Sequence, residues 1–145
     1  MAAAQGIIVP GAPSPVGHYP HARRVGDLLY ISGAGPRDAA LNTVPGNVLD
    51  DAGNVIDHDI VAQWHSVTDN VELVLHHCGL DWADVVDVTV FLTDYDRDFA
   101  AYNALWAEKF PSIPDAPCRT TMEVSRLPGP IHIELKVIAQ FPQGA

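Results

Sequence analysis

The sequence predicts one α/β (α+β) domain, residues 1–145, in which a single mixed sheet carries two helices on one face. Three observations predict it: short β-rich runs near the N-terminus, two amphipathic helical repeats separated by a β-branched run, and two alternating runs at the C-terminus. The expected order is ββαβαββ, and placing both helices on one sheet face buries their apolar stripes. A chain of this length suits one domain and leaves no room for two independent cores.

The N-terminal part is expected to contain a short strand and a hairpin. The strand covers residues 6–9, and a loop rich in Pro and Gly follows it. Two β-rich runs within 21–33 flank the two-residue turn Gly26-Asp27, which is typical of a β-hairpin. Residues 36–54 are dense in Asn, Asp, Gly and Pro and are expected to form a loop.

The clearest helix is marked by apolar residues that recur at steps of four and three: Ile60, Trp64, Val67, Val71, Val74 and Cys78. Asp57 or Asp59 is expected to cap its start, and Gly79 to end it. A buried strand is expected over 85–93 and a second helix over 96–110, where Pro111 ends it.

The last two strands are expected to form a hairpin, with strands and connecting loop at 119–125, 131–141 and 126–130. Alternation places Glu134 on the polar face of the last strand. In the preceding strand the apolar set is Thr120, Met122 and Val124, which leaves Arg119 on the same face as Glu134. Arg119 and Glu134 are therefore expected to be direct or diagonal cross-strand neighbours.

The sheet face without helices is expected to be partly apolar. The strand at 85–93 carries apolar residues on both sides, and Ile138 adds one to the polar side of the last strand. Because a two-layer monomer would leave these side chains in water, the sequence predicts self-association.

Charge and hydropathy limit the classes of function. Eight Lys and Arg stand against 18 Asp and Glu, for a formal net charge of −10, which argues against a nucleic-acid partner. An acidic protein binds an anion only where it focuses a few cations, so each arginine matters. No apolar run approaches about 18 residues, so no membrane partner is expected. The start lacks the features of a secretion signal, so a cytoplasmic location is expected.

Two interpretations of Arg119 and Glu134 stay open on the residues alone. The first is an ordinary cross-strand ion pair, worth about 0 to 1 kcal/mol. The second is a site in which the guanidinium of Arg119 binds a substrate carboxylate and Glu134 handles water or protons. Arg119 favours the second because it follows the Pro-rich loop 111–117, at the start of a strand where a cleft can open.

Asn103 is a further candidate. It falls within the stripe that Phe99, Trp106 and Phe110 define on the second helix, so its amide is expected to be buried. A buried amide needs partners, and Asn103 either holds a loop carbonyl or shapes a pocket wall.

Two other kinds of site lack the spacing that they need. Ser32 has no glycine two positions before it, so it does not form a nucleophile elbow. The pairs His18 with His21 and His76 with His77 follow no zinc-binding pattern. Neither a metal nor an organic cofactor is expected.

Five segments and a final dipeptide occur in an order that matches one known family: Gly17–Ala22, Gly26–Gly33, Asp87–Thr93, Tyr102-Asn103, Arg119–Pro128 and Ile133-Glu134. The most specific is the run Arg-x-x-x-Glu-Val-x-x-Leu-Pro that begins at Arg119. Over nearly its whole length the chain resembles the Rid (reactive intermediate, or enamine/imine, deaminase) family. The resemblance implies a chorismate-mutase-like fold and a homotrimer with a pocket at each subunit interface.

The resemblance also implies roles for individual residues. The residue matching Arg119 binds the substrate carboxylate, and the residue matching Glu134 positions water. The residues expected to line the pocket are Tyr19, Ser32, Gly33 and Asn103. The chain departs from the family where Thr121 replaces a frequent cysteine and where Pro20-His21 replaces Ser-Gln.

Gly-x-Tyr-Pro-His followed by Arg-Val-Gly-Asp is most similar to the 2-aminomuconate deaminase branch. The leading hypothesis is hydrolytic deamination of 2-aminomuconate to 4-oxalocrotonate and ammonia in bacterial degradation of aromatic compounds. Arg119 would hold the carboxylate next to the imine carbon, Glu134 the attacking water, and His21 or His18 the second carboxylate. The alternatives are a broad enamine/imine deaminase that clears 2-aminoacrylate-type intermediates and a non-catalytic trimer that binds small molecules.

Overall fold

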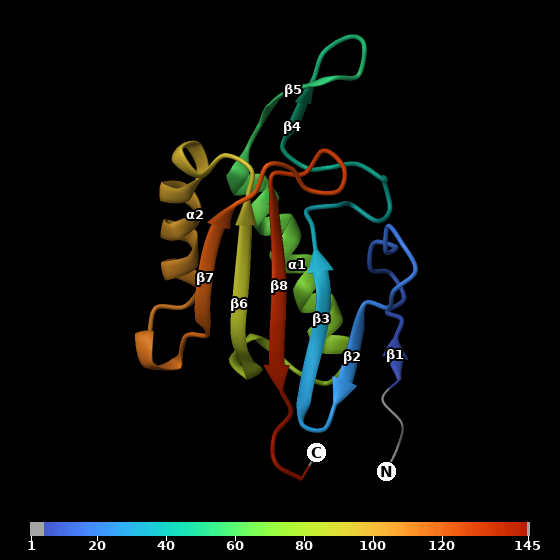
Figure 1. The fold of residues 1–145 in the computed structure, drawn as a ribbon, viewed down its shortest axis with the longest axis vertical. Coiled ribbons are helices and arrows are strands. Elements are labelled where there is room, and N and C mark those ends of the chain that lie inside the picture. Colours follow the sequence, from blue (N-terminus) through green and yellow to red (C-terminus); the bar gives the residue numbers. More distant parts are fainter. Residues whose placement is uncertain (1–4, 145) are drawn as a thin grey trace.

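In the computed structural model, which describes residues 5–144, one six-stranded sheet carries two α-helices on one face (Figure 1). The strand order is β1-β2-β3-β8-β6-β7. The sheet contains β1 (Gly6–Ile7), β2 (Ala22–Val25), β3 (Leu28–Ala34), β6 (Val85–Leu92), β7 (Cys118–Glu123) and β8 (Ile133–Gln140). The mixed α+β class predicted from the sequence is confirmed.

The two helices are α1 (Ile60–His77) and α2 (Tyr95–Lys109), and both begin and end where local sequence signals place them. Asp59 caps α1 by accepting from the backbone N–H of Val61, which decides between the two predicted caps. Gly79 has a φ of +76°, the left-handed conformation in which glycine commonly ends a helix. Short 3₁₀ turns at Trp82–Asp84 and Ile113–Asp115 lead into β6 and β7.

The core lies between the helices and the central strands. The predicted stripe of α1 is buried, and it meets the buried face of β8, in which Ile133, Leu135 and Val137 are almost inaccessible to solvent. Neither α-helix of the described chain is both long and apolar enough to cross a membrane.

The prediction that residues 36–54 form only a loop is wrong. A separate two-stranded sheet pairs β4 (Asn47–Leu49) with β5 (Val55–His58). The polar residues between them make its turn, since Asp50 accepts hydrogen bonds from the backbone N–H groups of Ala52 and Asn54. The Asn, Asp and Gly residues that suggested a loop therefore close a small hairpin.

The predicted hairpin of the last two strands is also wrong. β6 lies between β7 and β8, pairing parallel with β7 and antiparallel with β8 (Figure 1). Parallel strands need a crossover, and α2 supplies it between β6 and β7. The loop 124–132 then passes the end of β6, where Val124 donates to the carbonyl of Leu92 and Thr93 donates to that of His132.

This topology reverses the face expected for Arg119. In the ladder Arg119 pairs with Val88, which is fully buried beneath the helices, whereas Glu134 pairs with Phe91. Because Val88 and Phe91 are three positions apart on one strand, their side chains point to opposite faces. Arg119 lies on the helix face of the sheet, and Glu134 lies on the open face.

The open sheet face carries apolar side chains, as the sequence predicted. Met122, Tyr30 and Val86 are each about 40 % exposed there. The expectation of self-association rests on these residues and stays a prediction.

Candidate active site

A pocket opens where the N-terminal loop meets the end of β3 and the start of β8, with about 590 Å³ of empty space including its open mouth. Five residues predicted for the site line it: Tyr19, His21, Ser32, Gly33 and Glu134. The structure therefore brings most of the predicted site residues together.

A break in the β3–β8 ladder shapes the pocket floor. The register shifts between Ile31 and Ala34, so Ser32 and Gly33 lie in an irregular stretch of β3. A Cβ atom at Gly33 would lie 2.9 Å from Oε2 of Glu134. A side chain at position 33 would displace the Glu134 carboxylate, which packs directly against the backbone of β3.

The pocket holds Glu134 in an environment that favours its neutral form. Burial raises the pKa of the Glu134 carboxyl above its usual value, and the positive charge of Arg37 partly offsets this increase. A carboxyl with a raised pKa at the edge of a pocket is typical of groups that accept and release protons.

Tyr19 and Ser32 organise the loop that forms one wall. The Ser32 hydroxyl donates to the carbonyl of Pro20 at 2.7 Å, and the Tyr19 hydroxyl accepts from the backbone N–H of Val16 at 3.3 Å. These bonds fix the N-terminal loop over the end of β3.

His21 is not the free donor that the sequence suggested. Its Nδ1 accepts from the backbone N–H of Val9 at 3.0 Å, and its Nε2 lies 2.8 Å from the carbonyl oxygen of Pro13. Both nitrogens thus hold the loop, and His18, the other suggestion, is exposed and does not line the pocket. Neither histidine is placed to bind a second substrate carboxylate.

Sequence reasoning missed Arg37. This half-buried residue lines the pocket, and its Nη2 donates to the carbonyl of Pro128 at 2.7 Å. The only signal in the sequence was its place directly after the β3 segment, and the expected loop at 36–54 concealed it.

Arg119 lies outside this pocket. Its guanidinium carbon is 5.2 Å from the ring centre of Tyr102 and 5.0 Å from that of Trp106, within cation–π range. Its Nη1 is buried and has no hydrogen-bond partner among residues 5–144. The rings of Tyr102 and Trp106 thus form an aromatic platform for Arg119. Thr121, on the same face of β7, forms a hydrogen bond with the Tyr102 hydroxyl at 2.5 Å and so holds this ring beside Arg119.

The prediction that Arg119 and Glu134 are cross-strand neighbours is therefore wrong. The expected match of Thr120 and Met122 to the core failed because α2 offers aromatic rings and a hydroxyl to the other side of β7, where Arg119 and Thr121 point. Within one protomer the two predicted catalytic residues lie on opposite faces of the sheet with β6 between their strands.

Asn103 is exposed, contrary to the expectation of a buried amide. The buried residues of α2 are Asp98, Tyr102 and Trp106. Asn103 is the residue after Tyr102, so its side chain points away from this buried stripe. Asn103 follows Tyr102 in the chain, and it lies on the helix that carries the Arg119 platform.

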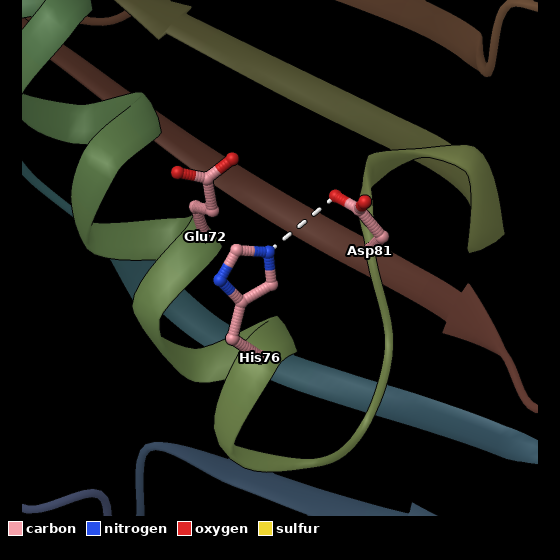
Figure 2. A group of neighbouring side chains, drawn as sticks. All are labelled: Glu72, His76 and Asp81. Atoms are coloured by element: carbon pink, nitrogen blue, oxygen red, sulfur yellow. Dashed lines mark ion pairs between the residues drawn. The ribbon is translucent and has the colours of Figure 1, made fainter.

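Within the described residues, one group has the geometry to hold a metal ion: Glu72, His76 and Asp81 (Figure 2). Their ligand atoms lie within 4.8 Å of one another, and His76 forms an ion pair with Asp81 at 3.5 Å. Glu72 and His76 lie on the opposite side of α1 from the pocket residues Asn70 and Val74, since two residues correspond to about 200° of helix. This group is separate from the candidate active site.

Fold and pocket together define a class: an α+β domain with one main sheet, two helices on one face, and a small-molecule pocket beside the end of β3. The sequence pattern of the family described as endoribonuclease L-PSP matches residues 10–141. The chain belongs to this family, whose members include proteins named RutC and Rid.

The chain is similar to relatives of almost its own length. The RutC family protein SSO3206 of Saccharolobus solfataricus is 37 % identical over 134 residues, covering 92 % of this chain and 95 % of that protein. The structure of YyfA from Yersinia pestis, described as a Rid family protein of unknown function, matches with 31 % identity and a TM-score of 0.76, covering 95 % of this chain and 99 % of that one. The structure of Escherichia coli TdcF with bound serine matches with 26 % identity and a TM-score of 0.78, covering 95 % and 99 %.

Proposed function

We propose that the protein is a hydrolytic deaminase of carboxylate-bearing enamines and imines, and that its substrate is 2-aminomuconate. The enamine tautomerises to an imine, water adds to the C=N carbon, and loss of ammonia leaves the C=O of 4-oxalocrotonate. An imine carbon is already electrophilic, so the reaction needs only orientation of the substrate, a positioned water and proton transfer.

The buried, unpaired Nη1 of Arg119 is the observation that carries this function. A buried donor without a partner is rare in proteins and calls for an acceptor. The Tyr102 and Trp106 rings hold the guanidinium in place, and a guanidinium binds a carboxylate through two parallel hydrogen bonds. In this proposal the acceptor is the substrate carboxylate next to the imine carbon.

Glu134 is the second supporting element. Its carboxyl lines the pocket beside Gly33, and burial raises the pKa of this carboxyl above its usual value. When ionised, it accepts a hydrogen bond from the attacking water and takes the proton that leaves it.

A homotrimer reconciles the two halves of the site. Arg119 and Glu134 lie on opposite faces of one sheet, so a site that uses both needs Arg119 from one copy and Glu134 from another. A cyclic trimer provides three such contacts, and the apolar open face of the sheet is available to form them. Asn103, exposed on α2, would then reach the same interface as Arg119.

Nucleic-acid cleavage, which the descriptive name of the family mentions, has less support from this chain. The net charge is −10, and the pocket lining has a single arginine and no lysine. Binding of a phosphate backbone requires a concentrated basic surface.

The deciding experiment compares turnover of 2-aminomuconate with turnover of 2-aminoacrylate by the purified protein. We expect the higher kcat/KM with 2-aminomuconate and loss of activity in Arg119→Ala. A clear preference for 2-aminoacrylate would instead identify the protein as a broad enamine/imine deaminase. Binding of both compounds without ammonia release would support the non-catalytic trimer, and full activity of a folded Arg119→Ala variant would rule out the mechanism.

A further inference from the structure

We infer that Arg37 binds the second carboxylate of a dicarboxylate substrate and so makes the pocket selective for dicarboxylic over monocarboxylic ligands. This assignment rests on the proposed function, because it places the reacting carbon near Glu134. It fills the role for which the sequence offered only His21, whose ring nitrogens hold the N-terminal loop, or His18, which does not line the pocket.

The chain holds Arg37 firmly at the pocket wall. The side-chain amide of Asn70, on α1, donates to the carbonyls of Gly35 and Arg37, both at 2.9 Å. The Arg37 Nη2 also donates to Pro128 at 2.7 Å, which links this segment to the loop before β8. Arg37 is thus held at its backbone by Asn70 and at its guanidinium by Pro128, and a ligand need not order it.

The charge of Arg37 is available to a ligand. Among the residues that line the pocket, Arg37 and Glu134 are the only Arg, Lys, Asp or Glu side chains. Within residues 5–144 no carboxylate oxygen lies within 4.0 Å of the Arg37 guanidinium, although its charge lowers the pKa of the Glu134 carboxyl. Arg37 therefore lines the pocket without a contact ion pair among the described residues, and Glu134 is the carboxyl group that its charge affects.

The arrangement suits an acid with a carboxylate at each end. Arg119 of one copy takes the carboxylate beside the reacting carbon, Glu134 of the next copy faces that carbon, and Arg37 lies on the same wall as Glu134. A monocarboxylate leaves Arg37 without an anion in a partly desolvated pocket, and an unmet polar group there disfavours binding. Selectivity would then come from Arg37, because a monocarboxylate has no second carboxylate to bind its guanidinium.

The rival role for Arg37 is structural, because its bond to Pro128 joins two loops. Arg37→Gln separates the two roles: an amide N–H still donates to a carbonyl, but the charge is lost. Arg126→Gln is the matched control, because it removes the same charge. Arg126 is exposed in the loop 124–132, which also contains Pro128, and it does not line the pocket.

The probes are trans,trans-muconate and sorbate, six-carbon dienoates that differ only in whether the far end is a carboxylate or a methyl group. Dissociation constants measured by calorimetry are expected to favour muconate by about 10- to 100-fold in the unaltered protein, the range for a charge-assisted hydrogen bond. We expect Arg37→Gln to lose most of this preference, Arg37→Lys to keep part of it, and Arg126→Gln to keep it fully.

Two results would overturn the role of Arg37: an unaltered preference in Arg37→Gln, or an equal loss of affinity for muconate and sorbate. Failure of the proposed function looks different. A protein that prefers muconate through Arg37 but releases no ammonia from 2-aminomuconate would keep the dicarboxylate subsite and lose the deaminase. A protein that deaminates 2-aminomuconate with no muconate preference would do the reverse.

Discussion

In the proposed mechanism, the Glu134 carboxyl combines a catalytic role with a cost in stability. Burial raises its pKa, so between the usual carboxyl pKa of about 4.3 and the higher folded value the folded protein holds more protons at this group than the unfolded chain. The stability that comes from the protonated Glu134 carboxyl is therefore fully present below the usual pKa. It is lost as the pH rises through the folded pKa. The proposed mechanism uses the opposite, ionised state of the Glu134 carboxyl.

We therefore expect Glu134→Gln to lower kcat/KM by about 10²- to 10⁴-fold and to remove the acidic limb of the pH profile that this group causes. The same variant should be as stable as the unaltered protein, or more stable, at pH 7, and the difference should shrink below the usual carboxyl pKa. Urea unfolding at several pH values measures this. Marked destabilisation at pH 7 would show that the Glu134 carboxylate is instead a structural ion.

Gly33 is predicted to affect activity only through the position of the Glu134 carboxylate. A methyl group at Gly33 would approach the Glu134 carboxylate to 2.9 Å, and the end of that side chain would have to move. Gly33→Ala should fold normally yet lower kcat/KM by about tenfold or more, since small displacements of catalytic groups are costly.

A double-mutant cycle tests this coupling. In a Glu134→Gln background, Gly33→Ala should have a much smaller effect on the residual rate. Additive losses in the two variants would mean that Gly33 acts through the backbone of β3 rather than through Glu134.

At the level of elements, periodic patterns predicted well and pairings between distant strands did not. The stripe of α1, its Asp59 cap and the Gly26 turn follow from local sequence, and the structure confirms them. The position of β7 beside β6 depends on the α2 crossover, which local alternation does not encode. The alternation of Thr120 and Met122 predicts that these weakly apolar side chains face the core. That prediction placed the Arg119 side chain on the wrong face of the sheet.

A buried polar cluster joins β5, α2 and the start of β8, and it also escaped sequence reasoning. His58 Nε2 lies 2.8 Å from Asp98 Oδ2, with both side chains buried, and the His58 ring stacks on that of His132 at 3.7 Å. Arg97, also on α2, donates from its Nη2 to the carbonyl of His58. These contacts fix the small β4–β5 sheet to the body of the domain.

Asp98→Ala is expected to destabilise the protein by about 3–5 kcal/mol, because it removes one partner of a buried pair. Asp96→Ala is the control: Asp96 is exposed in the first turn of the same helix, and its loss should cost less than about 1 kcal/mol. Urea denaturation compares the two. Equal effects would mean that the His58–Asp98 contact contributes no more than a surface charge.

At the level of the whole molecule, the proposed trimer would combine features that lie apart in one protomer. One sheet face presents Glu134 and a pocket, the other presents Arg119 on an aromatic platform, and apolar side chains remain exposed on the open face. Family membership and five of the residues that line the pocket followed from sequence motifs. The placement of Arg119 and Glu134 on opposite faces of the sheet did not, since it follows from tertiary pairing.

Mixing two inactive variants tests this division directly. If each site takes Arg119 from one copy and Glu134 from its neighbour, Arg119→Ala and Glu134→Gln protomers refolded together at equal amounts should form one intact site in about four, because each half is intact with a probability of about one half. We expect about a quarter of the unaltered activity, against almost none for either variant refolded alone. Since a site built within one protomer would carry a defect in every copy, a mixture as inactive as its components would exclude a shared site, and a mass measurement of the mixed oligomer would establish that the two variants had assembled together.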